Sequence, residues 1–240
     1  MMSEFYSRTR LLLQEEGVSR LRGAHVLVVG LGGVGGYVAE QLCRAGVGRL
    51  TLVDGDCVSE SNLNRQLIAL CSTVGRPKAE LFGARFTDIN PDCEVTALID
   101  FLRDSRTVEL LETNRYDCVV DCIDTLSPKV FLLYHAHRLS LPVVSSMGSG
   151  GKMDPSQVKV SDISKSHTCP LAAMVRKRLR RMGVQDGIRV VFSTEEVPSH
   201  AMVEDVSENH RTTLGTISYM PPLFGCYIAS EVIKILLRNE

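Results

Sequence analysis

The chain has 240 residues, of which 44% are hydrophobic and 23% charged, so its composition excludes a disordered chain, a coiled coil and a collagen-like fibre. Lys and Arg number 27 against 28 Asp and Glu, and the net charge of −1 excludes a globally basic nucleic-acid binder but not a local basic patch. The eight cysteines include no C-x-x-C pair, so no zinc is expected, and their position in apolar runs favours a reducing, cytoplasmic compartment.

Apolar, β-rich runs alternate with helical patterns through the first 147 residues. We expect strands at 25–30, 49–54, 93–99, 116–123 and 142–146, and helices at 35–45, 77–90, 107–114 and 129–139. Strand, helix and strand repeated in this way predict an α/β fold of the Rossmann-like, doubly wound type. Its sheet is expected to be mainly parallel and covered on both faces.

The pattern changes after residue 147. Strands are expected at 158–161 and 188–193, with a helix at 171–182 between them, a polar loop at 195–213 and a buried C-terminal helix within 214–237. We therefore predict one domain over residues 1–240. Residues 1–147 form its nucleotide-binding half, and residues 148–240 extend the sheet with antiparallel strands and form a substrate surface.

A glycine-rich turn, GLGGVGG, follows the first expected strand and opens the first expected helix. Gly30, Gly32 and Gly35 fit the G-x-G-x-x-G spacing, which allows a tight turn, a phosphate beside the backbone and close packing of helix on strand. Asp54 ends the second strand, where a carboxylate accepts hydrogen bonds from ribose hydroxyls. Together these features predict a nucleotide site, and by themselves they fit an NAD-dependent oxidoreductase.

The segment after Asp54 favours a triphosphate over a dinucleotide. A triphosphate carries more negative charge than the glycine turn neutralises, and Arg65 and Lys78 offer a bidentate and a point-charge contact. Taken singly, either cation fits an ordinary solvent-exposed position. Asp124 follows the fourth strand at the carboxyl edge of the sheet, where ligands of open α/β folds bind and a carboxylate can hold Mg²⁺.

These motifs, in their order and spacing, resemble a known family. GLGGVGG, LVDGD, SNLNRQ, the lysine of GRPKAE and the DCIDT segment are similar to the ubiquitin-activating-enzyme-like adenylyltransferases of the ThiF type. The second half, with GSGGKMDPSQV and PLAAMVRKRL, resembles the tRNA threonylcarbamoyladenosine dehydratase branch, as does RTRLLLQEEGVSRL before the first strand. The resemblance implies activation of a side-chain carboxylate of a modified tRNA adenosine as an acyl-adenylate, followed by cyclisation with loss of water.

The resemblance also implies roles for individual residues. ATP is expected on Gly30, Gly32, Gly33, Gly35, Asp54, Asp56, Asn64, Arg65, Gln66, Lys78, Asp124 and Thr125, with Mg²⁺ on Asp124. The expected catalytic set is Arg8, Arg65, Lys78, Asp124 and Cys169. Arg8 resembles an arginine that reaches across a homodimer into the partner's ATP site. A sulfur-relay protein linked to a cysteine desulfurase is a further partner that the resemblance allows.

The helix at 171–182 carries the chain's densest positive charge, in Arg176, Lys177, Arg178, Arg180 and Arg181. Such a run is either a solvated helix face or a contact for the phosphate backbone of tRNA. Cys169 precedes Pro170 at the start of this helix, where a thiol is either a helix cap or a nucleophile that captures the activated acyl group or sulfur.

Three other functions stay open from the sequence. The first is an adenylyltransferase for a ubiquitin-like sulfur-carrier protein, against which the missing C-x-x-C pairs count. The second is a nucleotide-sensing or scaffold protein without turnover, and the third is an NAD oxidoreductase. Arg65, Lys78 and Asp124, all present, argue against a protein that binds ATP without turnover, and an NAD oxidoreductase would leave the phosphate cations unexplained.

Overall fold

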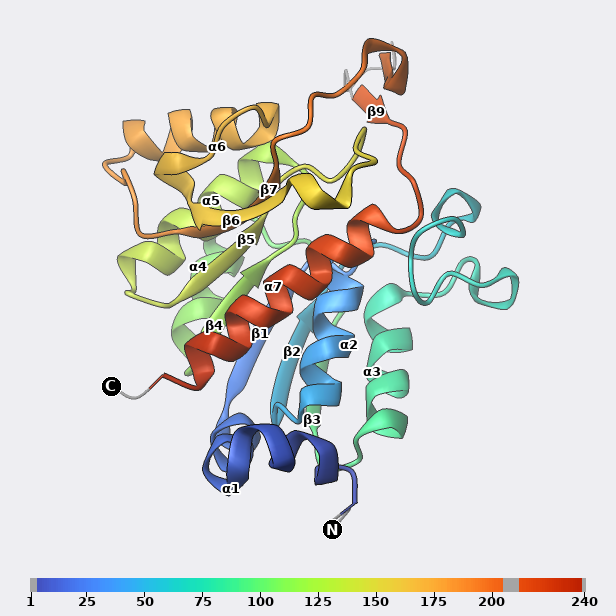
Figure 1. Ribbon diagram of the computed structural model, residues 1–240, viewed down its shortest axis with the longest axis vertical. Helices are drawn as coiled ribbons and strands as arrows, with labels where there is room; N and C mark the ends of the chain where they lie inside the picture. The colour runs from blue at the N-terminus through green and yellow to red at the C-terminus, as the bar shows by residue number, and fades with distance from the viewer. Residues whose placement is uncertain (1–3, 205–211, 239–240) are drawn as a thin grey trace.

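The computed structural model describes residues 4–204 and 212–238 (Figure 1). A seven-stranded sheet runs through it in the order β3-β2-β1-β4-β5-β7-β6. Its strands are β1 (His25–Val29), β2 (Arg49–Val53), β3 (Glu94–Leu98), β4 (Cys118–Asp121), β5 (Val143–Ser146), β6 (Val158–Asp162) and β7 (Arg189–Ser193). All neighbouring strands pair in parallel except β6 and β7, which are antiparallel. The predicted α/β fold and its antiparallel extension are confirmed.

Seven α-helices and five short 3-10 helices complete the described part of the chain. The α-helices are α1 (Ser7–Gly23), α2 (Gly35–Ala45), α3 (Lys78–Ile89), α4 (Asp104–Thr113), α5 (Leu126–Arg138), α6 (Pro170–Arg181) and α7 (Met220–Leu236). The 3-10 helices are Glu60–Asn62, Cys71–Thr73, Pro155–Gln157, Ile163–Lys165 and Ser199–Ala201. None of the helices described is long and apolar enough to cross a membrane.

The sheet separates two hydrophobic cores, as the alternation along β1 shows. Val26 and Val28 pack in a core with side chains of α2, α3 and α7, whereas Leu27 and Val29 pack in a second core with α4, α5 and α6. Figure 1 shows α2, α3 and α7 on the same face of the sheet. Successive residues of a strand point to opposite faces, so a strand buried on both faces is apolar throughout, which is the pattern that predicted it.

Two parts of the chain differ from the sequence predictions. The prediction of a loop at 195–213 is wrong in part, because β8 (Met202–Glu204) pairs with β9 (Thr212–Leu214). Residues 205–211 of this predicted loop lie outside the described residues. Met202 and Val203 of β8 are both exposed, so this strand lacks the alternation of buried and exposed residues that predicts a strand. Helix α1 lies before the first predicted strand, and its backbone kinks at Gln14. The division of the chain at residue 147 stays a prediction.

Candidate functional site

The glycine turn lies at the carboxyl ends of β1 and β4, where backbone segments touch. Gly30 has a φ of +86°, and a Cβ there would lie 2.8 Å from the carbonyl oxygen of Cys122. A Cβ at Gly35 would overlap the carbonyl oxygen of Gly30. Both positions therefore require glycine. Helix α2 begins at Gly35, and no side chain caps it, so the positive end of its dipole is available to attract an anion.

Asp54 ties this turn to the end of β2. Its Oδ2 accepts a hydrogen bond from the amide of Leu31 over 2.6 Å, and its Oδ1 accepts one from the amide of Asp56 over 2.8 Å. Burial raises the pKa of the Asp54 carboxyl above its ordinary value, against the opposing effect of the Lys78 charge. Each carboxylate oxygen has a further lone pair, so the group that shapes the turn can also accept hydrogen bonds from a ligand.

The SNLNRQ segment lies directly against the turn. A Cβ at Gly33 would lie 3.4 Å from Arg65 Cγ, and one at Gly32 would lie 3.7 Å from Gln66 Nε2. Gln66 is buried, and its Oε1 has no hydrogen-bond partner in the part of the chain that the structure describes. A buried acceptor without a donor is costly, so this oxygen marks a place where a bound donor would be favourable.

Lys78 adds positive charge at the start of α3. Its side chain is buried, and Nζ lies 3.1 Å from Oδ2 of Asp56, whose side chain is exposed. Because the carboxylate is solvated, it neutralises the buried ammonium only in part, and the ammonium can still attract a nearby anion. The structure thus brings together the glycine turn, Asp54, Asp56, Asn64, Arg65, Gln66 and Lys78, as the sequence predicted.

Asp124 and Thr125 follow β4 and are both exposed. The preceding residues Cys122 and Ile123 touch the turn, since a Cβ at Gly30 would lie 3.2 Å from the amide nitrogen of Ile123. Within residues 4–204 and 212–238, no three His, Cys, Asp or Glu side chains are placed to share a metal ion. Asp124 is therefore a single carboxylate, which suits a cation that is otherwise held by phosphates and water.

The cations of α6 divide into two groups. Arg176 is half-buried and donates from Nη1 to the carbonyl and hydroxyl oxygens of Ser166, both over 2.7 Å, so it serves the local fold. Arg178 donates to Ser127 Oγ over 2.9 Å, which places α6 beside the segment that follows Asp124. The other three cations are exposed and have no partner among the described residues: Lys177, Arg180 and Arg181.

The two remaining predicted catalytic residues are Cys169 and Arg8. Cys169 is 3% exposed, and its Sγ lies 3.8 Å from where a Cβ of Gly148 would be, behind the loop that follows β5. Arg8 is exposed on α1, at the end of the molecule opposite the start of α2 (Figure 1). The catalytic roles of both residues stay predictions.

Sequence reasoning missed a buried ion pair beneath the site. Asp121 and Lys129 have fully buried side chains, and Lys129 Nζ lies 2.7 Å from Asp121 Oδ2. The available signal was an acid at the end of the apolar run in YDCVVD, a strand that is otherwise buried.

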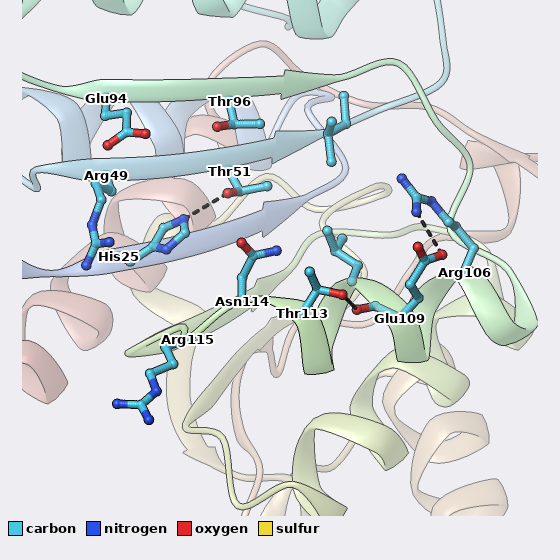
Figure 2. A pocket seen from close by; sticks show the side chains of 12 residues that line it. His25, Arg49, Thr51, Glu94, Thr96, Arg106, Glu109, Thr113, Asn114 and Arg115 are labelled. Carbon is cyan, nitrogen blue, oxygen red and sulfur yellow. Dashed lines mark hydrogen bonds and ion pairs between the residues drawn. The ribbon is translucent and has the colours of Figure 1, made fainter.

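A separate cavity of about 430 Å³ lies at the other edge of the sheet, beside α4 (Figure 2). His25, Arg49 and Glu94 line it, and each is the first residue of its strand. His25 Nε2 lies 2.8 Å from Thr51 Oγ1, and burial followed by the Arg49 charge lowers the pKa of the imidazole. The strands begin at this edge next to solvent, which by itself explains why their first residues are polar, without a bound ligand. The cavity is separate from the glycine-turn site.

Comparison with known proteins distinguishes the possible functions. The ThiF family profile matches residues 6–240. The tRNA threonylcarbamoyladenosine dehydratase of Bacillus subtilis strain 168 is 46% identical over 242 residues, covering 98% of this chain and 95% of its own. The sulfur carrier protein ThiS adenylyltransferase of Escherichia coli K12 is 36% identical over 152 residues, which is 62% of this chain and 60% of its own.

A solved structure extends the likeness to the whole fold. Escherichia coli tRNA N6-threonylcarbamoyladenosine dehydratase in complex with AMP has a TM-score of 0.87 at 35% identity, covering 97% of this chain and 94% of that chain. Its complex with ATP has a TM-score of 0.85 over 97% and 93% of the two chains. The likeness to the dehydratases therefore extends over nearly the whole chain, whereas the match to the sulfur-carrier enzyme covers 62% of it.

Proposed function

Because this chain belongs to the ThiF family, we propose that it is an ATP-dependent tRNA threonylcarbamoyladenosine dehydratase. The observation that carries the proposal is its likeness to dehydratases of that name along nearly its whole length. The glycine turn with Asp54, Arg65 and Lys78 supports the ATP-dependent part, since cations beside an open helix N-terminus suit a polyphosphate.

The residues of the site fit a nucleotide on two observations. Gln66 Oε1 is a buried acceptor that lacks a donor, and a ligand hydroxyl or amino group would supply one. Gly33 has little room for a side chain, because a Cβ there would lie 3.1 Å from Pro221 Cβ and 3.4 Å from Arg65 Cγ. The turn is thus a narrow cradle in which backbone amides reach the ligand directly.

The reaction brings together two anions, the substrate carboxylate and ATP, so the cations of the site are needed to reduce the repulsion between them. ATP supplies a good leaving group: the substrate carboxylate attacks the α-phosphate with loss of pyrophosphate, and ring closure then expels AMP, so that the nucleoside loses one water. Arg65 and Lys78 reduce the repulsion between carboxylate and phosphates and stabilise the charge that develops on the phosphorus oxygens. The amides at the start of α2 act in the same direction without reorganising.

The remaining assignments belong to the same proposal. Asp124 would hold Mg²⁺ together with phosphate oxygens and water. In a homodimer, Arg8 would reach the partner's site. The exposed cations Lys177, Arg178, Arg180 and Arg181 would contact the tRNA backbone. The free state of all eight cysteines fits the cytoplasm, and Cys169 stays the candidate thiol for an acyl group or for sulfur from a relay protein.

The test is to incubate the protein with Mg²⁺–ATP and tRNA that carries threonylcarbamoyladenosine, and then to digest the tRNA gently and weigh the nucleoside. We expect a product lighter by one water, formed with ATP and absent without it. An unchanged nucleoside would contradict the dehydratase. Adenylation of an added carrier protein that ends in Gly-Gly would then establish the sulfur-carrier activity instead.

A further inference from the structure

The buried ion pair of Asp121 and Lys129 binds the backbone of one residue, Ile123, in the loop between β4 and α5. The amide of Ile123 donates to Asp121 Oδ1 over 3.1 Å, and the carbonyl oxygen of Ile123 accepts a hydrogen bond from Lys129 Nζ over 2.8 Å. Ser145 on β5 donates to Asp121 Oδ2 over 2.6 Å and so fixes the carboxylate from the neighbouring strand. Both polar backbone groups of the residue that precedes Asp124 are therefore bound to one ion pair.

The same loop is also part of the wall of the glycine turn. The amide of Cys122 donates to the carbonyl oxygen of Val29 over 2.8 Å, and the carbonyl oxygen of Cys122 lies against Gly30. Asp124, in contrast, is exposed and has no side-chain hydrogen bond among the residues described. Its position thus depends on the backbone that Asp121 and Lys129 hold.

Stability alone does not account for this pair. Removing two charges from water costs several kcal/mol per ion, and apolar residues of similar volume often stabilise a core as well or better. The pair does something that an apolar pair cannot do, because Lys129 donates to a backbone carbonyl and Asp121 accepts from a backbone amide.

We infer that Lys129 and Asp121 are positioning residues that hold the 122–124 loop so that Asp124 meets the Mg²⁺–ATP phosphates. Neither side chain touches substrate. Hydrogen bonds behind a metal ligand orient it, and their loss typically weakens metal affinity about 10–100-fold. The inference rests on the proposed function, in which Asp124 holds Mg²⁺.

Two double variants separate positioning from packing. Asp121→Asn/Lys129→Met and Asp121→Asn/Lys129→Gln both remove the two buried charges together, so neither leaves an unpaired ion in the core. They differ in that glutamine keeps a donor for the Ile123 carbonyl and methionine does not. A third variant, Glu40→Gln, breaks the ion pairs of the buried Glu40 carboxylate with Arg44 and Arg85, away from the loop, and controls for general loss of stability.

The measurement is the dissociation constant of ATP in Mg²⁺ and in EDTA, with the thermal unfolding midpoint of each variant. We expect Asp121→Asn/Lys129→Met to lose most of the Mg²⁺-dependent gain in affinity, about 10–100-fold. Asp121→Asn/Lys129→Gln and Glu40→Gln should keep that gain, even though their unfolding midpoints are lowered as well. If Mg²⁺ increased the ATP affinity of the two double variants equally, this inference would be overturned and the proposed function would not. An unmodified protein that binds ATP no better with Mg²⁺ would overturn the Mg²⁺–ATP part of the proposed function as well.

Discussion

Asn64 donates a hydrogen bond from Nδ2 to the carbonyl oxygen of Thr216 over 2.9 Å, and its Oδ1 accepts one from Arg65 Nη1 over 3.0 Å. The first bond joins the segment beside the glycine turn to the segment that leads into α7. The second holds the guanidinium that we assign to the phosphates. Asn64 therefore connects the two halves of the chain at the point where Arg65 is oriented.

Asn64→Ala should weaken ATP binding without slowing the chemistry. Loss of the hold on Arg65 is expected to raise KM for ATP about fivefold, the equivalent of about 1 kcal/mol for a hydrogen bond, with kcat nearly unchanged. Pyrophosphate exchange measures both constants. Asn114→Ala, at an exposed position on the opposite edge, is the matched control and should leave both unchanged. A lower kcat at constant KM would instead assign Asn64 to the reacting phosphates.

If the site is shared between two subunits, as proposed, Arg8→Ala and Asp124→Ala should each abolish dehydration when present in both subunits. In a mixed dimer, the subunit that carries Arg8→Ala keeps its own Asp124 and receives Arg8 from its partner, so one of the two sites is complete. Random exchange of the two inactive proteins should therefore restore about a quarter of the normal activity, since half of the dimers have one site each. The nucleoside mass measurement follows this recovery. A mixture that stays inactive would contradict the shared site.

Replacing Lys177, Arg180 and Arg181 together by serine should weaken tRNA binding and leave ATP binding unchanged. Each lost phosphate contact is expected to reduce the slope of log K against log salt by about 0.7–0.9. Binding titrations of tRNA at several salt concentrations check this. Arg176→Ser is the contrast: because Arg176 is bound to Ser166, it should lower the unfolding midpoint and leave the slope nearly unchanged. An unchanged slope in the triple variant would show that α6 is a solvated face.

The buried Glu40 carboxylate predicts a loss of stability in acid. Burial alone would raise its pKa, but hydrogen bonds from Arg85 and Arg44 outweigh that effect and hold the pKa below the ordinary value of 4.5. A lowered pKa in the folded state adds stability above the unfolded pKa and loses it as the pH falls. Glu40→Gln should therefore cost about 1–2 kcal/mol of unfolding free energy near pH 7, since both arginines are partly exposed, and the difference should shrink below about pH 4.5. Denaturant unfolding at a series of pH values tests this, and a difference independent of pH would contradict it.

The sheet was predictable because strands that are buried on both faces form short, continuous apolar runs in the sequence. Strands such as HVLVV and CVVD are apolar on both faces, and the runs that alternate with helical patterns correspond to β1–β5 and α2–α5 in the structure. Helix α4 was placed three residues late, because Asp104–Arg106 begin it with polar residues that carry no periodicity. The β8–β9 pair was missed for a related reason: Met202 and Val203, which follow each other in β8, are both exposed, so burial does not select this strand.

The site was predictable where chemistry depends on residue type and spacing. The turn, Asp54, Arg65 and Lys78 do lie together, since strand ends meet at one edge of a parallel sheet. Contacts between side chains of different secondary-structure elements were not predictable in this way. That Arg176 is bound to Ser166, and that Lys129 is paired with Asp121, depends on tertiary packing that no local pattern encodes.

Because Cys169 is enclosed whereas other cysteines are exposed, the thiols differ in how readily a reagent reaches them and can serve as chemical probes of local opening. Cys57, Cys71 and Cys226 are exposed and open to alkylation, whereas Cys169 lies behind Gly148 in a loop whose later residues are bound at Glu195 and Gly215. A reagent reaches Cys169 only after a local opening of the structure around it, so its modification rate reports the free energy of that opening when it is smaller than that of global unfolding. Mass spectrometry of labelled protein would read that opening in the presence and absence of each substrate.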